Sequence, residues 1–215
     1  SVLRNASCGD ISIFQTDAHE FSVQVASSGM DSWIEKSGML IHGLAASYSC
    51  FVVWSGKKAR VYRVDNHLRK AEAMDSFDVS SNSMAIADTT HIAEEALFVA
   101  DAQIVRILNF AGTQKGSITF SEAEGNPTHV DIHGSYLVIL TDRNVVKVID
   151  VHTPTKPKQM GSAGKFEEPK LTSDEDTEKE NEKNAHVDTP AVGTMATGFG
   201  GLGSEFKFFA GLGGL

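Results

Sequence analysis

The chain has 215 residues, of which 41% are hydrophobic, and a formal net charge of −9 at pH 7. This length and composition predict one ordinary globular core and exclude a fibrous or wholly disordered chain. Residues 165–188 alone carry nine Asp and Glu against four Lys, which leaves the rest only mildly acidic and argues against a nucleic-acid binder, a class that needs a concentrated basic surface.

Three further features narrow the class of protein. Cys8 and Cys50 are the only cysteines, too few for a disulfide framework and without a second pair for a zinc site, so we expect a reducing compartment. No stretch approaches the roughly 18 consecutive apolar residues of a membrane span. The start at Ser1 shows neither an initiator methionine nor a signal-peptide profile, which predicts an interior segment of a longer chain.

A strand pattern recurs along the chain and closes each time on a short acidic or amide residue. The closing residues are Asp17, Asp65, Asn109 and Asp150, which lie 48, 44 and 41 residues apart. This spacing is close to the period of four-stranded propeller blades of the WD-repeat type. We interpret residues 1–17 as the end of an earlier unit whose beginning is missing.

Three full units follow, each with two apolar strands, a tight polar turn and a third strand that carries the closing residue. The first comprises residues 41–46, 51–54, the turn 55–58 and 59–65; the second 84–88, 96–100, the turn 101–102 and 103–109; the third 129–133, 136–141, the turn 142–143 and 144–150. Shorter outer strands are expected at residues 20–25, 73–79 and 116–120. The sequence therefore predicts an all-β fold, a WD-repeat-like β-propeller fragment of about three blades plus part of another, over residues 1–163.

The middle strands of the three units are continuous apolar runs: FVVW at 51–54, ALFVA at 96–100 and YLVIL at 136–140. Continuous runs, unlike alternating ones, indicate burial on both faces, as between stacked blades. Strand spacing alone also allows an antiparallel sandwich, but the longer period favours blades. Because an incomplete ring would expose apolar blade faces, we expect the isolated chain to be poorly soluble or only partly folded.

The strand pattern stops near residue 163. Residues 164–190 are acidic and nearly free of aromatic residues, so we predict a disordered linker that cannot bury enough apolar surface to offset the entropy of ordering. Residues 191–215 form a Gly/Phe-rich low-complexity tail, to which no stable fold is assigned. Ser173 precedes three acidic residues, a context that suits an acid-directed kinase, although a solvated charge run without regulatory meaning is favoured.

Candidate chemical sites are weak. Residues 198–203 read GFGGLG and satisfy a dinucleotide fingerprint, but they lack the preceding strand and following helix that the chemistry requires, which indicates a chance match. His129, Asp131 and His133 share one strand face like a row of metal ligands; we favour instead a row lining a wet central channel, because no fourth ligand is evident. We predict no catalytic, cofactor or metal site and no enzyme; a propeller enzyme, the least favoured reading, would depend on these three residues and Asp142.

One stretch resembles a known family. Residues 120–127 (FSEAEGNP), continuing through Val130, Asp131 and Ile132, resemble the second propeller of the intraflagellar transport protein 140 family, and residues 51–57 (FVVWSGK) are similar to an earlier blade of it. The resemblance covers roughly residues 1–155. It implies a non-catalytic scaffold within intraflagellar transport complex A, which serves retrograde ciliary transport and the entry of membrane-protein cargo into cilia.

The resemblance also sets expectations about partners and location. It implies other complex A subunits and ciliary cargo proteins as partners, and a location in the cilium, the ciliary basal body and the cytoplasm. No cofactor, nucleic acid, membrane insertion or small-molecule substrate is expected. The alternative is a vesicle-coat or nuclear-pore-type scaffold, since those proteins also combine propellers with helical arrays.

Overall fold

The computed structural model describes residues 3–28, 32–65 and 67–165. The described part consists of β-strands and one 3-10 turn, η1 (Ala26–Ser28). All the described strands lie in one compact unit, Ser1–Glu168. Among the described residues, no helix is long and apolar enough to cross a membrane.

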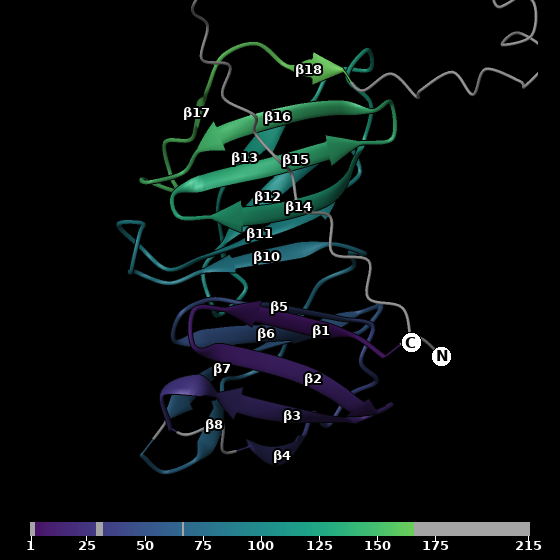
Figure 1. The fold of residues 1–215 in the computed structure, drawn as a ribbon. Helices are drawn as coiled ribbons and strands as arrows, with labels where there is room; N and C mark the ends of the chain where they lie inside the picture. Colours follow the sequence, from purple (N-terminus) through teal and green to yellow (C-terminus); the bar gives the residue numbers. More distant parts are fainter. Residues whose placement is uncertain (1–2, 29–31, 66, 166–215) are drawn as a thin grey trace, which may run out of the picture. The chain divides into compact units, whose positions relative to one another are not determined.

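The strands form four antiparallel sheets, here called blades 1 to 4, and each blade is made from one continuous piece of chain (Figure 1). Blade 1 contains β1 (Asn5–Cys8), β2 (Ile11–Asp17), β3 (Glu20–Val25) and β4 (Ser32–Lys36). Blade 2 contains β5 (Gly43–Ala46), β6 (Cys50–Trp54), β7 (Lys58–Asp65), β8 (Lys70–Ala73) and β9 (Phe77–Asp78). Blade 3 contains β10 (Met84–Ala87), β11 (Ala96–Asp101), β12 (Ile104–Leu108) and β13 (Gln114–Thr119). Blade 4 contains β14 (Pro127–His133), β15 (Tyr136–Thr141), β16 (Val145–Asp150), β17 (Lys158–Gln159) and β18 (Gly164–Lys165).

Successive blades contact one another through their first strands. β1 contacts β5, β5 contacts β10, and β10 contacts β14, so the first strand of each blade is its innermost one (Figure 1). Successive sheets stacked around a set of inner strands form a β-propeller. The all-β propeller prediction is therefore confirmed, and the sandwich alternative is excluded.

Three apolar cores lie between the four blades. Between blades 1 and 2, Ile13 and Val23 pack with Phe51 and Val53. Between blades 2 and 3, side chains of β6 and β7 pack with those of β10 and β11. Between blades 3 and 4, Phe98 and Ile107 pack with side chains of β14, β15 and β16. Alternate residues of one strand thus belong to different cores, which explains why the middle strands of blades 2 and 3 are apolar throughout.

The predicted place of residues 11–17 within their blade is wrong. β1 is a short polar strand (NASC), and its pairing with β2 makes residues 11–17 the second strand of blade 1, not the third strand of an earlier unit. Residues 20–25 are accordingly the third strand, and the outer strand is β4, Ser32–Lys36. The sequence did not reveal β1 because it has no apolar run, and its inner position needs only small side chains. Blade 1 is a whole four-stranded blade.

The other outer strands agree in part with the expectation. The predicted strand at 116–120 corresponds to β13 (Gln114–Thr119), whereas the predicted strand at 73–79 is divided into β8 and β9. β18 extends the pairing of blade 4 two residues beyond the predicted end at residue 163. The rest of the predicted linker at 164–190 and the tail at 191–215 lie outside the described residues.

Burial of the third middle strand differs from the expectation. Every residue of β6 is buried, and five of the six residues of β11 are buried, as predicted. In β15, however, Tyr136 and Val138 are exposed while Leu137 and Ile139 are fully buried. The reason is position: one face of β15 packs on blade 3, and no blade among the described residues covers the other.

Candidate functional site

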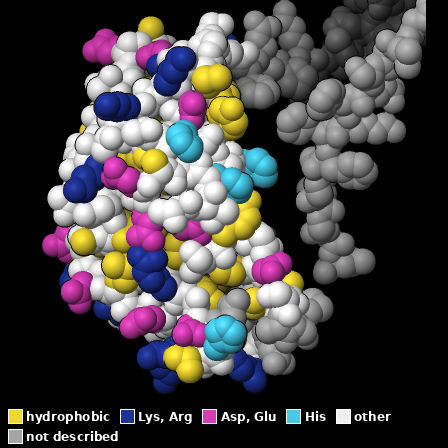
Figure 2. Space-filling model, turned by 90° about the vertical axis from the view of Figure 1, so that its left-hand side faces the viewer, with side chains coloured by type: hydrophobic (Ala, Val, Ile, Leu, Met, Phe, Trp, Pro, Cys, Tyr) yellow, Lys and Arg dark blue, Asp and Glu magenta, His cyan; other side chains and the backbone are white. Residues whose placement is uncertain are grey.

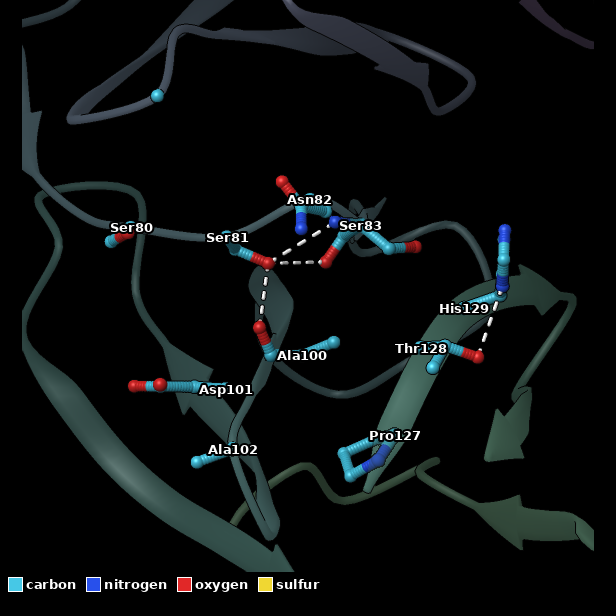
Figure 3. Close-up of a pocket in the computed structure, with 11 residues that line it drawn as sticks. Ser80, Ser81, Asn82, Ser83, Ala100, Asp101, Ala102, Pro127, Thr128 and His129 are labelled. Carbon is cyan, nitrogen blue, oxygen red and sulfur yellow. Dashed lines mark hydrogen bonds between the residues drawn. The ribbon is translucent and has the colours of Figure 1, made fainter. Parts of the chain in front are cut away.

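A hollow of about 430 Å³ opens at one end of the inner strands and is lined by three blades (Figure 3). Its lining comes from the β6–β7 turn at Gly56, the connection Ser80–Ser83 that leads into β10, the β11–β12 turn, and the start of β14 at Pro127–His129. Because loops on a propeller end are held by rigid sheets, such a surface is suited to binding. The hollow is the candidate functional site.

One wall of the hollow is fixed by hydrogen bonds. The Ser81 hydroxyl lies 2.6 Å from the Ala100 carbonyl oxygen, to which it donates, and accepts a bond of 3.2 Å from the Ser83 N–H (Figure 3). The Ser83 hydroxyl in turn accepts a 3.0 Å bond from the Val130 N–H, which joins blades 3 and 4. The wall is thus pre-organised, so binding there loses little conformational entropy.

Several polar groups remain available at the rim. The Asn82 and Ser80 side chains are exposed, and the exposed His129 ring contacts the hydroxyl of Thr128 through Nδ1 at 3.1 Å. Thr128 itself donates to the Leu140 carbonyl at 3.2 Å, and Asp101 forms an ion pair of 3.0 Å with Arg106. The Ser81 and Thr128 hydroxyls both donate their protons to carbonyl oxygens. The polar groups of the hollow are therefore suited to hydrogen-bonding recognition and not to nucleophilic chemistry.

The opposite ends of the inner strands carry a buried carboxylate. Asp88 of blade 3 accepts bonds of 2.7 Å from both the N–H and the hydroxyl of Ser49 in blade 2, and one of 3.0 Å from the Thr90 N–H. Burial acts to raise the pKa of Asp88, but the hydrogen bonds from Thr90 and Ser49 outweigh it, and the pKa lies below its ordinary value. Asp88 therefore joins two blades and is a structural group.

The stretch that carries the family resemblance, residues 120–127, forms a clamp on blade 4. Glu124 pairs with Lys147 and accepts bonds of 2.8 and 2.9 Å from the N–H and the hydroxyl of Ser121. The Lys147 ammonium also lies 4.7 Å from the centroid of the Phe120 ring. Lys147 foremost, with the Ser121 N–H, lowers the pKa of Glu124 to about 2. These contacts account for the motif without a ligand.

The histidine row lies on the innermost strand of blade 4. His129, Asp131 and His133 are all exposed on the inner strand β14, opposite Leu140, Val138 and Tyr136 of β15. They share the face of blade 4 that no blade among the described residues covers, and a channel lining stays a prediction. Within the described part of the chain, no group of three His, Cys, Asp or Glu side chains is placed to hold a metal ion.

The remaining candidates are resolved in different ways. Asp142 accepts bonds of 2.8 and 3.0 Å from the backbone N–H and the side-chain amide of Asn126, a structural role in the loop before β14. Residues 198–203 and Ser173 lie outside the described residues. The hollow itself was missed by sequence reasoning, because Ser80–Ser83 and Thr128 belong to no motif. The sequence marked only separate parts of its lining, namely Gly56 in the predicted turn 55–58, the predicted turn 101–102 and His129.

The surface around these elements carries mixed charge. Figure 2 shows acidic and basic side chains interspersed over one face of the molecule. A nucleic-acid site of the phosphate-tracking kind concentrates basic residues instead. The charges of the face in view are therefore not arranged as in such a site.

Comparisons with known proteins agree with this fold. A family model described as the second β-propeller of IFT140 matches residues 9–185. Among solved structures, BBS1N in complex with ARL6DN shares 14% identity at a TM-score of 0.50, over 73% of this chain and 49% of that chain. Hsv2 of Kluyvelomyces marxianus shares 13% identity at a TM-score of 0.43, over 59% of this chain and 39% of that one. The chain thus spans less than half of the length of each of these two chains.

Proposed function

Because the chain belongs to the family of the second β-propeller of IFT140, we propose that it is a non-catalytic protein-interaction scaffold of intraflagellar transport. The observation that carries the proposal is the family match over residues 9–185, together with four blades stacked as a propeller. In this role it contacts other subunits of intraflagellar transport complex A and ciliary cargo proteins. Its expected locations are the cilium, the basal body and the cytoplasm, where it serves retrograde transport and cargo entry.

The pocket chemistry supports a scaffold over an enzyme. The hollow offers the exposed amide of Asn82, hydroxyl of Ser80 and imidazole of His129, whereas the Ser81 and Thr128 hydroxyls are held by main-chain carbonyls. Such groups suit hydrogen bonds to a partner's backbone and polar side chains. We assign the hollow as the partner-binding site of the scaffold, with Asn82 and Ser80 at its exposed rim.

The proposal is tested in ciliated cells with a tagged full-length chain. We expect the tag in the cilium and at the basal body, and complex A subunits in the purified material. A variant with Asn82→Arg and Ser80→Arg should lose those subunits while folding normally, because both side chains are exposed. Thr89→Arg, exposed in the connection between β10 and β11 at the other end of the strands, is the matched control and should keep them.

Three outcomes would count against parts of the proposal. Absence of the tag from cilium and basal body would overturn the ciliary assignment, and a vesicle-coat or nuclear-envelope location would favour the alternative scaffold. Unchanged binding by the double-arginine variant would remove the hollow as the partner site. A phenotype from replacing His129, Asp131, His133 and Asp142 by Ala, in a variant that still binds its partners, would instead support the propeller enzyme.

A further inference from the structure

One turn at the surface combines an exposed serine with the acidic residues that some protein kinases recognise. Residues 121–124 read SEAE, so Ser121 is followed by glutamates one and three positions later. Ser121 and Glu122 are exposed, and Glu124 is half-buried. Acid-directed kinases select their substrates by the negative charges that follow the serine. Ser121 thus has both the exposure and the sequence context of a phosphorylation site.

The turn is closed by a few hydrogen bonds at the surface. The hydroxyl and the N–H of Ser121 both donate to Glu124 Oε2, at 2.9 and 2.8 Å. The Ser121 carbonyl oxygen accepts from the N–H groups of Glu124 and Gly125, at 3.0 and 3.2 Å. Segments held by exposed hydrogen bonds open locally at low free energy. The serine therefore becomes accessible to a kinase when the turn opens, without unfolding of a blade core.

The carboxylate that closes the turn also pairs with a buried cation. Glu124 Oε1 contacts the ammonium of Lys147, a residue of β16 whose side chain is only 8% exposed. A phosphate on Ser121 brings about two negative charges to the place of the hydroxyl that now bonds Glu124. The two anions then repel each other and compete for the single Lys147 ammonium. Phosphorylation therefore breaks the bonds between Ser121 and the Glu124 side chain and loosens the turn.

The turn also positions one wall of the hollow. Residues 121–126 connect β13 to β14, as Ser80–Ser83 lead into β10 one blade earlier. The Glu124 carbonyl oxygen accepts a 2.5 Å bond from the Thr141 hydroxyl, which ties the turn to β15. Pro127–His129, the start of β14, follow directly and line the hollow. A rearrangement of the turn is thus transmitted to residues that line the hollow.

We propose that Ser121 is a phosphorylation site for an acid-directed serine kinase, and that its phosphate lowers the affinity of the hollow for a partner. The kinase transfers the γ-phosphoryl group of ATP to Ser121 Oγ: the O–H bond breaks as the O–P bond forms, the proton passes to a base of the kinase, and ADP leaves. The effect on affinity rests on the proposed function of the hollow as a partner site, whereas the modification itself does not.

The first test is phosphorylation of the purified 215-residue chain by an acid-directed kinase and ATP, followed by peptide mapping by mass spectrometry. Mapping distinguishes Ser121 from Ser173, which also precedes acidic residues. We expect phosphate on Ser121 and a loss of most of it in Glu122→Gln, because an exposed acid of the recognition sequence is removed. Glu72→Gln, an exposed position on β8, is the matched control and should keep it. An unmodified Ser121, or equal modification in both variants, would overturn the site.

The second test measures the coupling between positions 121 and 124 by urea unfolding at pH 7. Ser121→Glu should lower the folding equilibrium constant about tenfold, because it places a second carboxylate beside Glu124. The same substitution should have a much smaller effect in a chain that carries Glu124→Gln. Ser117→Glu, exposed on β13, is the matched control and should have a small effect in both chains. Equal losses from Ser121→Glu in the two chains would refute the repulsion.

The third test compares the complex A subunits recovered with the tagged full-length chain from ciliated cells. Ser121→Glu should recover several-fold fewer subunits, and Ser121→Ala as many as wild type. If Ser121→Glu keeps the subunits while the Asn82→Arg and Ser80→Arg variant loses them, the switch is refuted and the hollow remains the partner site. If both variants keep them, the hollow is not the partner site and the switch fails with it.

Discussion

Phe51 offers the sharpest test of the blade-to-blade cores. Its ring is fully buried on β6 and lies 5.3 Å, centroid to centroid, from Phe21 of blade 1 and 4.9 Å from Tyr62 of its own blade. Replacing Phe51 by Ala removes both contacts and leaves a cavity between two sheets. Buried Phe→Ala changes cost about 3–5 kcal/mol, and each aromatic pair adds about 0.5–1.5 kcal/mol beyond buried area. Domain stabilities are commonly about 5–15 kcal/mol, so we expect the variant to be close to unfolding.

The assay is urea unfolding followed by tryptophan fluorescence, with Phe14→Ala as the matched control. Phe14 lies on β2 of blade 1, but its side chain is 43% exposed and points away from blade 2. Removing its ring should therefore lower the free energy of unfolding by less than about 1 kcal/mol. Equal effects of the two substitutions, or a Phe51→Ala variant as stable as wild type, would refute the assignment of β6 to a core shared by blades 1 and 2.

Three further predictions concern single positions. Gly43→Ala should destabilise the chain strongly, because a Cβ there would collide with the Trp54 ring, whereas Gly164→Ala, with open space around it, should not; thermal melts of both decide this. Ala102→Gly should raise the free energy of unfolding by up to about 1 kcal/mol, because Ala102 has a φ of +46°, a conformation that costs non-glycine residues about 1–2 kcal/mol; urea midpoints measure it. The pKa of Glu124 is lowered from 4.5 to about 2, so its contribution to stability is complete above about pH 4.5 and is lost as the pH falls toward 2. Glu124→Gln should therefore flatten that part of a plot of unfolding free energy against pH. An unchanged plot would contradict the pairing of Glu124 with Lys147.

The sequence was informative where a strand is buried on both faces. The runs FVVW and ALFVA predicted β6 and β11, because side chains on both faces of those strands are buried in apolar cores. The spacing of Asp65, Asn109 and Asp150 then placed three blades correctly. The YLVIL run looked equally buried, yet Tyr136 and Val138 are exposed, because a sequence pattern records that a face is apolar and not whether a neighbour covers it.

The sequence was uninformative where small or polar side chains do the packing. β1 (NASC) escaped notice because an inner strand needs close approach, which Ala6 and Cys8 permit without an apolar run. The hollow at Ser80–Ser83 also escaped, since it is assembled by loops of three blades far apart in sequence. Conversely, the spacing of His129, Asp131 and His133 was correctly read as one strand face, but the neighbouring residues Tyr136 and Val138 give that face its apolar character.

The most direct test of the central claim is a set of methyl-to-methyl nuclear Overhauser effects from β6. If the strand is buried between two neighbouring blades, Val53 should show contacts to Ile13 and Val23 of blade 1, while Val52 should show contacts to Ile86 and Leu97 of blade 3. Contacts from both valines to the same sheet, or from neither to another blade, would contradict the stacked-blade structure.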